Sequence, residues 1–374
     1  MQMSNEKLVV CLPTFFSPQD KRSTGGTISN FSLIKELAKF GQIEVISPIV
    51  SPELIESKLH NVKLITQPGL EGASFRAKAR KKVWLRNQIR QRALRGDVGA
   101  FISTNGTSSF VNSVSPKRNI ILTRAFEDFL DYQVNGENFK ERLRKKVLEV
   151  LIDKRVKQCY QDAAMVITNS QFMRSEISRH FKIKQEKIAV LYPPVDFPET
   201  DYRPLPTTRK LRVGMINPKK IKGEDIFVAL AKVFKDIEFV YFSREDRQYG
   251  VDNIIYKGWG SDPAKLFESF DLLIAPSLWN EPFGRVAVEG IRSGIPVLVS
   301  NHGGIPETVT DSFVVKGDTL NDWKIKLIWL RDNPQEVAEA WQLTKQHTES
   351  FVSERHNENL KSYFSDYFRQ EKQV

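Results

Sequence analysis

The sequence has 374 residues, and 40% of them are hydrophobic, which is enough for two packed cores and argues against a disordered chain. Two cysteines with no pairing pattern exclude a disulfide framework, and no apolar run approaches the roughly 20 residues needed to span a bilayer. The net charge of +11 leaves nucleic acid, an anionic membrane and an anionic substrate open as partners.

The N-terminal half begins like a doubly wound α/β domain. Residues 7–12 read as a buried strand, Gly25 and Gly26 precede a helix that Gly41 ends, and residues 43–46 read as the second strand. There is no Gly-x-Gly-x-x-Gly, so a dinucleotide fingerprint is not supported. The two glycines either let the backbone approach an anionic group or form a flexible turn. The first apolar run is too short for a signal peptide, so we expect a cytoplasmic protein, at most peripheral on the inner face of a membrane.

Residues 71–96 form the most basic segment of the chain. Nine lysines and arginines face one acid, Glu71, and the segment has helical periodicity. Ala77, Trp84, Leu85 and Ile89 fall in one apolar stripe, to which Ala93 also belongs. A basic helix of this kind suits an anionic bilayer surface, and the alternative is a solvated helix whose stripe packs on its own domain. No recognised nucleic-acid-binding module accompanies the charge.

Two further strands are expected at residues 99–103 and 119–123, and polar residues follow the second. Arg124, Glu127 and Asp128 are acceptor-side candidates by position, and the alternative for each is helix-surface charge. Helices are expected at residues 139–164 and 170–180, with strands at 166–169 and 188–191. Residues 199–209 are polar and carry prolines, as expected of a linker.

The second half repeats the α/β pattern. Strands are expected at residues 211–216, 238–242 and 253–256. Lys222 and Gly223 lie in the loop between the first of these strands and a helix, where a cation can meet a diphosphate. Trp259 follows the third strand, where it either stacks on a nucleotide base or belongs to the core.

Residues 271–309 form the stretch around which the chain is organised. A buried strand at 272–275 is followed by a loop, a helix from Gly284 to Ser293, and another buried strand at 297–299. Glu281 precedes the helix and Glu289 lies inside it, with seven residues between them. Eight residues of helix span roughly 12 Å, so the two carboxylates cannot share a proton and are better placed to hold two parts of one elongated ligand.

Backbone N–H groups at the start of this helix attract anions such as phosphate. They belong to Phe283, Gly284 and Arg285. The alternative for the two glutamates is ordinary surface charge.

This stretch resembles the donor-site signature of retaining GT-B glycosyltransferases of the family 4-like type, which use nucleotide-sugars. The resemblance rests on Glu-x7-Glu enclosing Pro282-Phe283-Gly284, and on Gly-Gly-x-Pro-Glu at residues 303–307. It implies that Glu289 binds the ribose hydroxyls and that Glu281 contacts the donor sugar. It also implies that Lys222 holds the leaving diphosphate.

The resemblance further implies that Gly25 and Gly26 face the donor phosphates and the acceptor, and that Trp259 lies near the nucleotide base. The sequence departs from the family in two places. Met215 stands where many members carry an arginine, so Arg285 is either a substitute cation or a surface arginine. None of the five histidines lies in the loop after residues 119–123, where relatives place a histidine that touches the donor sugar.

The expected fold is α/β GT-B, with two Rossmann-like doubly wound domains facing each other across a cleft. The acceptor-side domain is expected at 1–198, the linker at 199–209 and the nucleotide-sugar-binding domain at 210–350. The C-terminal helix, residues 351–374, is expected to pack back on the first domain.

The expected activity is metal-independent, retaining transfer of a hexosyl-type sugar from a nucleoside-diphosphate-sugar to an acceptor hydroxyl, in bacterial surface polysaccharide or glycolipid assembly. Lys222 and Glu281 are the expected catalytic residues, and Asp-x-Asp is absent from the sequence. A UDP- or GDP-linked donor, a carbohydrate or lipid-linked acceptor and no separate cofactor are expected. The alternatives are a non-catalytic basic Rossmann protein that binds membrane or nucleic acid, and a GT-B sugar-nucleotide epimerase or phosphorylase.

Overall fold

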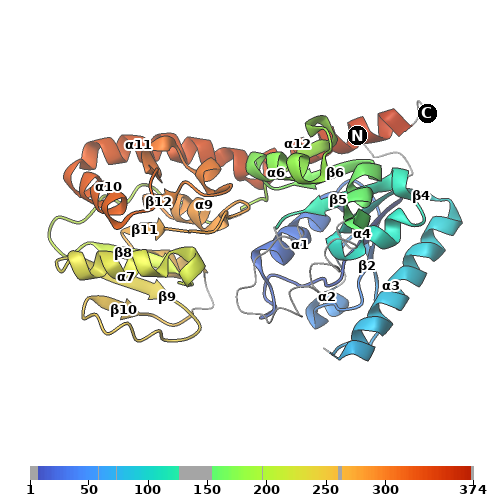
Figure 1. The fold of residues 1–374 in the computed structure, drawn as a ribbon, viewed down its shortest axis with the longest axis horizontal. Helices are drawn as coiled ribbons and strands as arrows, with labels where there is room; N and C mark the ends of the chain where they lie inside the picture. Colours follow the sequence, from blue (N-terminus) through green and yellow to red (C-terminus); the bar gives the residue numbers. More distant parts are fainter. Residues whose placement is uncertain are drawn as a thin grey trace. The chain divides into compact units, whose positions relative to one another are not determined.

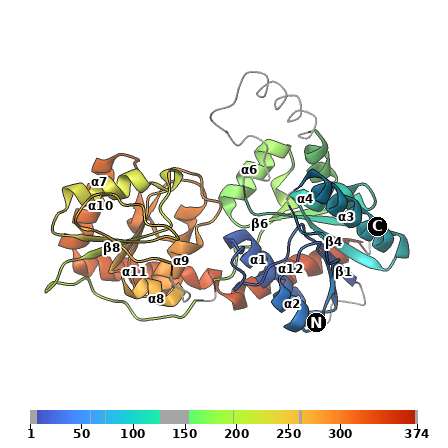
Figure 2. The same cartoon turned by 90° about the horizontal axis from the view of Figure 1, so that it is seen from below.

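The structure is a computed structural model and describes residues 7–57, 59–72, 74–125, 154–195, 197–259 and 263–371. The chain forms two compact units, Met1–Pro193 with Asn357–Val374, and Pro194–His356. Each unit is a parallel β-sheet covered by helices (Figure 1), and Figure 2 shows the same elements from below. The expected class of two Rossmann-like α/β domains is therefore confirmed.

The first unit contains a seven-stranded sheet in the order β3-β2-β1-β4-β5-β6-β7, with every pair parallel. Its strands are β1 (Lys7–Cys11), β2 (Ile43–Ile46), β3 (Val62–Ile65), β4 (Val98–Thr104), β5 (Asn119–Thr123), β6 (Met165–Thr168) and β7 (Ile188–Val190). In β1, Leu8 and Val10 join one hydrophobic cluster while Val9 and Cys11 join another, because successive side chains point to opposite faces. Both faces of this sheet are therefore buried.

Helices cover these two faces. They are α1 (Gly25–Leu37), α2 (Pro52–Ser57), α3 (Phe75–Arg95), α4 (Asn105–Asn112), a helical segment at residues 154–162, and α6 (Gln171–Phe181). On one face, Leu33 of α1 shares a cluster with Leu360 and Phe364 of α12 (Ser353–Glu371). On the other face, Leu85 and Ile89 of α3 pack with β1 and β4. The end of the C-terminal helix is thus part of the core of the first unit.

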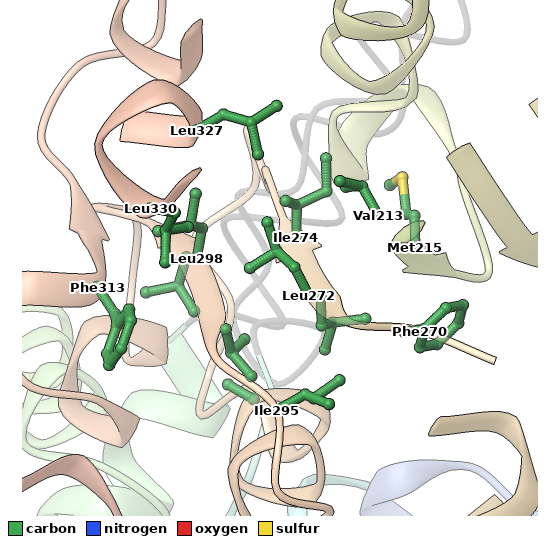
Figure 3. Packing of buried hydrophobic residues seen from close by; sticks show 14 of the residues in the cluster. Val213, Met215, Phe270, Leu272, Ile274, Ile295, Leu298, Phe313, Leu327 and Leu330 are labelled. Atoms are coloured by element: carbon green, nitrogen blue, oxygen red, sulfur yellow. The ribbon is translucent and has the colours of Figure 1, made fainter. Parts of the chain in front are cut away.

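The second unit contains a six-stranded parallel sheet in the order β10-β9-β8-β11-β12-β13. Its strands are β8 (Arg212–Ile216), β9 (Glu238–Phe242), β10 (Ile254–Tyr256), β11 (Leu272–Ala275), β12 (Val297–Ser300) and β13 (Val314–Val315), and its helices are α7 (Glu224–Val233), α8 (Pro263–Glu268), α9 (Arg285–Arg292), α10 (Leu320–Asp332) and α11 (Pro334–Thr348). Figure 3 shows part of its core, where Leu272 and Ile274 of β11 pack among apolar side chains from neighbouring elements.

In both sheets the strand order reverses beside the first strand of the unit: the next strands are added on one side of it, and the later strands on the other. In the first unit β1 lies between β2 and β4, and in the second unit β8 lies between β9 and β11. The connections after β1 and β4, and those after β8 and β11, therefore leave the sheet on opposite sides. Ligands of such sheets bind beyond the carboxyl ends of the strands at this switch point.

Residues 199–209, the expected linker, make hydrogen bonds to the second unit at several points. Thr200 N donates to Arg292 O at 2.8 Å, and Arg203 N donates to Gly294 O at 2.7 Å. At the end of the segment, Arg209 binds both carboxylate oxygens of Asp271 at 2.6 Å. The division between the units falls after Pro193, before the expected boundary at residue 198.

Candidate active site

Lys222 and Glu281 lie in the two loops at the switch point of the second sheet. Lys222 ends a 3-10 turn, Lys220–Lys222, between β8 and α7, and Glu281 lies between β11 and α9. These strands are neighbours in the sheet, so their carboxyl ends bring the two loops together. Lys222 Nζ lies 3.3 Å from Glu281 Oε1, with side chains 34% and 14% exposed. The two residues expected to be catalytic therefore form one ion pair.

Glycines fix the approach of these loops. Gly223 has φ +80°, and a Cβ there would lie 1.9 Å from the carbonyl oxygen of Pro276. Gly303 has φ +72°, and a Cβ there would lie 2.3 Å from the carbonyl oxygen of Glu281. That same oxygen accepts a hydrogen bond from Gly304 N at 2.6 Å. Glycine is therefore required at position 303, where the backbone comes close to that of Glu281.

Glu289 lies in the second turn of α9 and forms an ion pair with Arg285. The distance from Arg285 Nε to Glu289 Oε1 is 3.5 Å, and Arg285 Nη1 donates to Pro194 O at 2.8 Å. Burial raises the pKa of Glu289 above its ordinary value, and the positive charge of Arg285 opposes that rise in pKa. Arg285 thus contacts Glu289 and the carbonyl oxygen of Pro194, and its expected role as a substitute cation stays a prediction.

The helix start between these carboxylates is held by apolar packing. Phe283 is buried and meets Phe351 edge to face, with ring centroids 5.2 Å apart. Gly284 caps α9 with φ +92°, and a Cβ there would lie 2.4 Å from the side chain of Ile305. Only glycine fits this position. The side chain of Phe283 therefore anchors the loop, and anion binding by the backbone N–H groups at the start of α9 stays a prediction.

Trp259 follows β10, at the edge of the sheet, two strands away from β8. Its side chain is 50% exposed, so the alternative of a core tryptophan is wrong. The structure does not bring Trp259 into contact with Lys222 or Glu281. Its role at the nucleotide base remains a prediction.

In the first unit, Gly25 and Gly26 are the first residues of α1, which is the first helix after β1 at the switch point of that sheet. Thr24 caps the helix, and its hydroxyl and that of Thr27 form a reciprocal capping box. The glycines are therefore exposed residues of a helix N-terminus rather than a flexible turn before it.

Arg124 follows β5, and its carbonyl oxygen accepts from Asn169 Nδ2 at 2.9 Å. This contact joins the loop after β5 to the loop after β6. Glu127 and Asp128 lie outside the described residues. The acceptor-side roles of these three residues stay predictions.

His302, which lies between β12 and Gly303, is not among the residues predicted for the site from the sequence. Its Nε2 is 2.7 Å from Asp318 Oδ1, and its neighbour Gly303 forms a β-bridge with Glu281. Its position directly before the Gly-Gly could have pointed to this loop. Within the described ranges, no three His, Cys, Asp or Glu side chains are grouped so as to hold a metal ion.

Comparison with known proteins gives two family matches, one in each half of the chain. Residues 23–198 match the model described as Glycosyltransferase Family 4, and residues 237–346 match the model described as Glycosyl transferases group 1. The first match ends just beyond the first unit, and the second lies within the second unit.

Several curated proteins match part of the chain. The D-inositol 3-phosphate glycosyltransferase of Paenarthrobacter aurescens is 25% identical over 255 residues, which are 59% of this chain and 60% of that protein. An uncharacterized 41.2 kDa protein in the cps region of Klebsiella pneumoniae is 28% identical over 159 residues, which are 40% of this chain and 43% of that protein. The chain thus spans about half the length of the curated relatives it matches.

Solved structures match over nearly the whole chain. The sucrose-phosphate synthase of Thermosynechococcus elongatus has a TM-score of 0.71 at 15% identity and covers 98% of this chain and 100% of its own. HepE of Anabaena in complex with UDP-glucose has a TM-score of 0.68 at 17% identity and covers 96% of this chain and 99% of its own. At 15% and 17% sequence identity, these matches show that the fold is similar and nothing more.

Proposed function

The chain has the GT-B fold of group 1 and family 4-like glycosyltransferases, and we propose that it transfers a sugar from a nucleoside-diphosphate-sugar to an acceptor hydroxyl. The observation that carries this proposal is the Lys222–Glu281 ion pair at the switch point of the second sheet. In a nucleotide-sugar, one glycosidic bond separates the sugar from the diphosphate. A cation for the phosphate and a carboxylate for the sugar must therefore be neighbours, as these two residues are.

The two glutamates divide the donor between them in this proposal. Glu289 receives the ribose hydroxyls and Glu281 receives the sugar, with the diphosphate between them near Lys222 and the start of α9. The neighbour HepE was solved with UDP and with UDP-glucose, which supports a donor of the same class. A UDP- or GDP-linked hexose is the proposed donor.

The Lys222–Glu281 pair is suited to exchange partners when the donor arrives. The lysine side chain is 34% exposed, and a partly exposed pair of this kind contributes little to stability. A diphosphate can therefore take over Lys222 while Glu281 turns to the sugar hydroxyls. The pair keeps both side chains in place in the absence of donor.

The proposed reaction retains the anomeric configuration and uses no metal. The bond between the anomeric carbon and the diphosphate oxygen breaks, and the acceptor oxygen bonds to that carbon on the same face. The acceptor proton passes to the departing phosphate. Lys222 and the amides at the start of α9 stabilise the negative charge that develops on the leaving group.

A cytoplasmic enzyme of bacterial surface polysaccharide or glycolipid assembly is the proposed context, with a carbohydrate or lipid-linked acceptor and peripheral contact with the membrane. The support is the name of one relative, a protein in the cps region of Klebsiella pneumoniae.

A thermal-shift screen with UDP-, GDP- and ADP-sugars tests the proposal. At least one nucleotide-sugar should raise the Tm of the wild type, and the rise should be smaller for Glu289→Ala. The matched control is Glu339→Ala, which changes an exposed glutamate on α11 and should respond like the wild type. Failure of every nucleotide-sugar to raise Tm would contradict the proposal and favour a non-catalytic binding protein.

A further inference from the structure

Helix α3 has one side in the core of the first unit. Ala77, Leu85 and Ile89 are buried, and Trp84 is partly buried against the same cluster. Arg92 is also buried, with its Nε 3.1 Å from Glu44 Oε2. The apolar stripe seen in the sequence therefore packs on its own domain, and Trp84 belongs to that packing rather than to a free surface.

The opposite side of α3 carries an uncompensated row of cations. The 21 residues of the helix include no acid. Seven of its cations are exposed, and none of them takes part in an ion pair within the described part of the chain: Arg76, Lys78, Arg80, Lys82, Arg86, Arg90 and Arg95. Figure 1 shows α3 along the margin of the first unit. Because the cations repel one another and have no acids on the helix, this side is suited to an anionic partner.

Large apolar side chains stand among these cations. Val83 is 60% exposed and Leu94 is 76% exposed. They are eleven residues apart, about three turns of helix, so they project in the same direction. Arg80 and Arg86 flank Val83 at three residues on either side, and Arg76 and Arg90 lie two turns from it on the same face. The outward surface therefore has exposed apolar side chains set among cations.

Phe75, at the first turn of the helix, is 86% exposed and adds a further apolar group at one end. Water-exposed apolar groups surrounded by cations fit an interface that offers both anionic headgroups and hydrocarbon. A nucleic-acid backbone offers the anions alone and leaves the exposed apolar side chains without a partner.

We propose that the outward side of α3 docks the protein on the surface of an anionic lipid bilayer. The arginines bind lipid phosphates, while Val83 and Leu94 enter the boundary between headgroups and acyl chains. No helix in the described residues has the length and apolarity to cross a membrane, and surface docking requires none. The inference goes beyond the proposed reaction and stands whether or not the acceptor is lipid-linked.

Co-sedimentation with vesicles tests the surface directly. The wild type should sediment with phosphatidylcholine vesicles that contain phosphatidylglycerol, and much less with phosphatidylcholine alone. High salt should weaken the binding, because it screens exposed charges. Each cation at an anionic bilayer strengthens binding about fivefold, so loss of four should weaken it by roughly several hundredfold. The variant for this arm carries Arg76→Gln, Arg80→Gln, Arg86→Gln and Arg90→Gln.

The control variant removes the same charge from exposed lysines outside α3. It carries Lys117→Gln, Lys184→Gln, Lys235→Gln and Lys265→Gln. This protein should keep most of the vesicle binding of the wild type, which separates a docking surface from a net-charge effect. A second variant, Val83→Ser with Leu94→Ser, should keep the salt dependence but bind more weakly. Thermal unfolding and nucleotide-sugar binding check that each variant is folded.

Several results would overturn the inference. They are equal sedimentation of the α3 variant and the wild type, equal losses in the α3 and lysine variants, and strong wild-type binding to neutral vesicles. Displacement of the protein from anionic vesicles by a small excess of RNA would instead assign α3 to nucleic acid. Transfer to a soluble acceptor is measured separately, so failure of docking and failure of the proposed reaction are distinguishable.

Discussion

Glu289 lies in an environment that disfavours its charge and beside an arginine that favours it. Burial raises the pKa of this carboxyl, and Arg285, 3.5 Å away, counteracts the rise. A ribose hydroxyl donates its hydrogen bond best to an ionised carboxylate. In the proposed function, the pairing with Arg285 therefore favours the ionised form of Glu289 that the ribose would bind.

The pH dependence of nucleotide binding follows from this pair. Affinity for nucleoside diphosphate should fall as the pH drops through the pKa of Glu289, and this fall should begin at higher pH than for an ordinary glutamate. Arg285→Gln removes the opposing charge, raises the pKa of Glu289 further and moves the loss of affinity to higher pH. Arg285→Lys should restore part of the wild-type profile. Calorimetry over a series of pH values measures this affinity. If the affinity depends on pH identically in the wild type and in Arg285→Gln, Arg285 does not lower the pKa of Glu289.

The two glutamates should be separable by ligand. Glu289→Ala should weaken binding of free nucleoside diphosphate by about tenfold to a hundredfold, as expected for lost hydrogen bonds to a charged group. Glu281→Ala should spare that ligand and impair binding of the intact sugar donor. Calorimetry with both ligands distinguishes them. If the two variants lose both ligands alike, the assignment of separate contacts is wrong.

At the scale of elements, the site depends on loops that approach more closely than a side chain allows. Gly303 combines a positive φ with a clash against Glu281, whereas Gly96 has φ +74° with no atom within 4 Å of a Cβ. A comparison of alanine substitutions at these two glycines therefore separates two free-energy costs. At Gly96 only the left-handed backbone conformation is unfavourable, and at Gly303 the contact with Glu281 is added to it.

Gly303→Ala should destabilise the protein by more than Gly96→Ala, for which the left-handed conformation alone costs about 1–2 kcal/mol. Gly303→Ala should also lower affinity for the nucleotide-sugar, because the backbone of Glu281 must move. Chemical denaturation and calorimetry provide the two readouts. Equal destabilisation by the two substitutions would show that the contact beneath Glu281 is not needed.

Elements with strong apolar patterns could be predicted from the sequence to within a residue or two. Residues 43–46, 119–123, 238–242 and 272–275 coincide with strands β2, β5, β9 and β11, because buried parallel strands are nearly continuous apolar runs. Strand β3 was not predicted, since it lies at the sheet edge, is only partly buried and contains Lys63. Strand β13 has only two residues, too few for a pattern.

For the candidate site, the sequence predicted the residues but not their contacts. Spacing and residue type indicated Lys222, Glu281 and Glu289. The contact between the first two depends on the order of β8 and β11 in the sheet, which the sequence alone does not specify. The partners of Arg285 likewise required the fold.

At the scale of the whole molecule, the chain returns to its first unit at the end. Residues from Asn357 onward belong to the first unit, and Leu360 and Phe364 are buried in its core. The packing of the C-terminal helix on the first domain was expected only from the resemblance to the family. In the structure, this packing is produced by the apolar side chains that the helix buries in that core.

Removal of one buried side chain from this face should destabilise the protein. Leu360→Ala deletes a fully buried leucine and should cost about 2–5 kcal/mol. Leu343→Ala makes the same chemical change at a leucine that is 59% exposed and should cost about 0.5 kcal/mol or less. Thermal and chemical unfolding of the two variants give the comparison. A small effect of Leu360→Ala would mean that the C-terminal helix contributes little to the stability of the first unit.

The central claim is that Lys222 assists the departure of a nucleoside diphosphate. The measurement is the rate of diphosphate release from the nucleotide-sugar that binds in the thermal-shift screen, supplied with acceptor extract. Lys222→Ala should lower this rate by about a hundredfold or more while the protein stays folded, because it removes charge stabilisation of the leaving group. Lys219→Ala, an exposed lysine of the same loop, should stay within a few fold of the wild type, and a chelator should leave the wild-type rate unchanged. A Lys222→Ala rate within a few fold of the wild type, or a strict need for added divalent metal, would contradict the account.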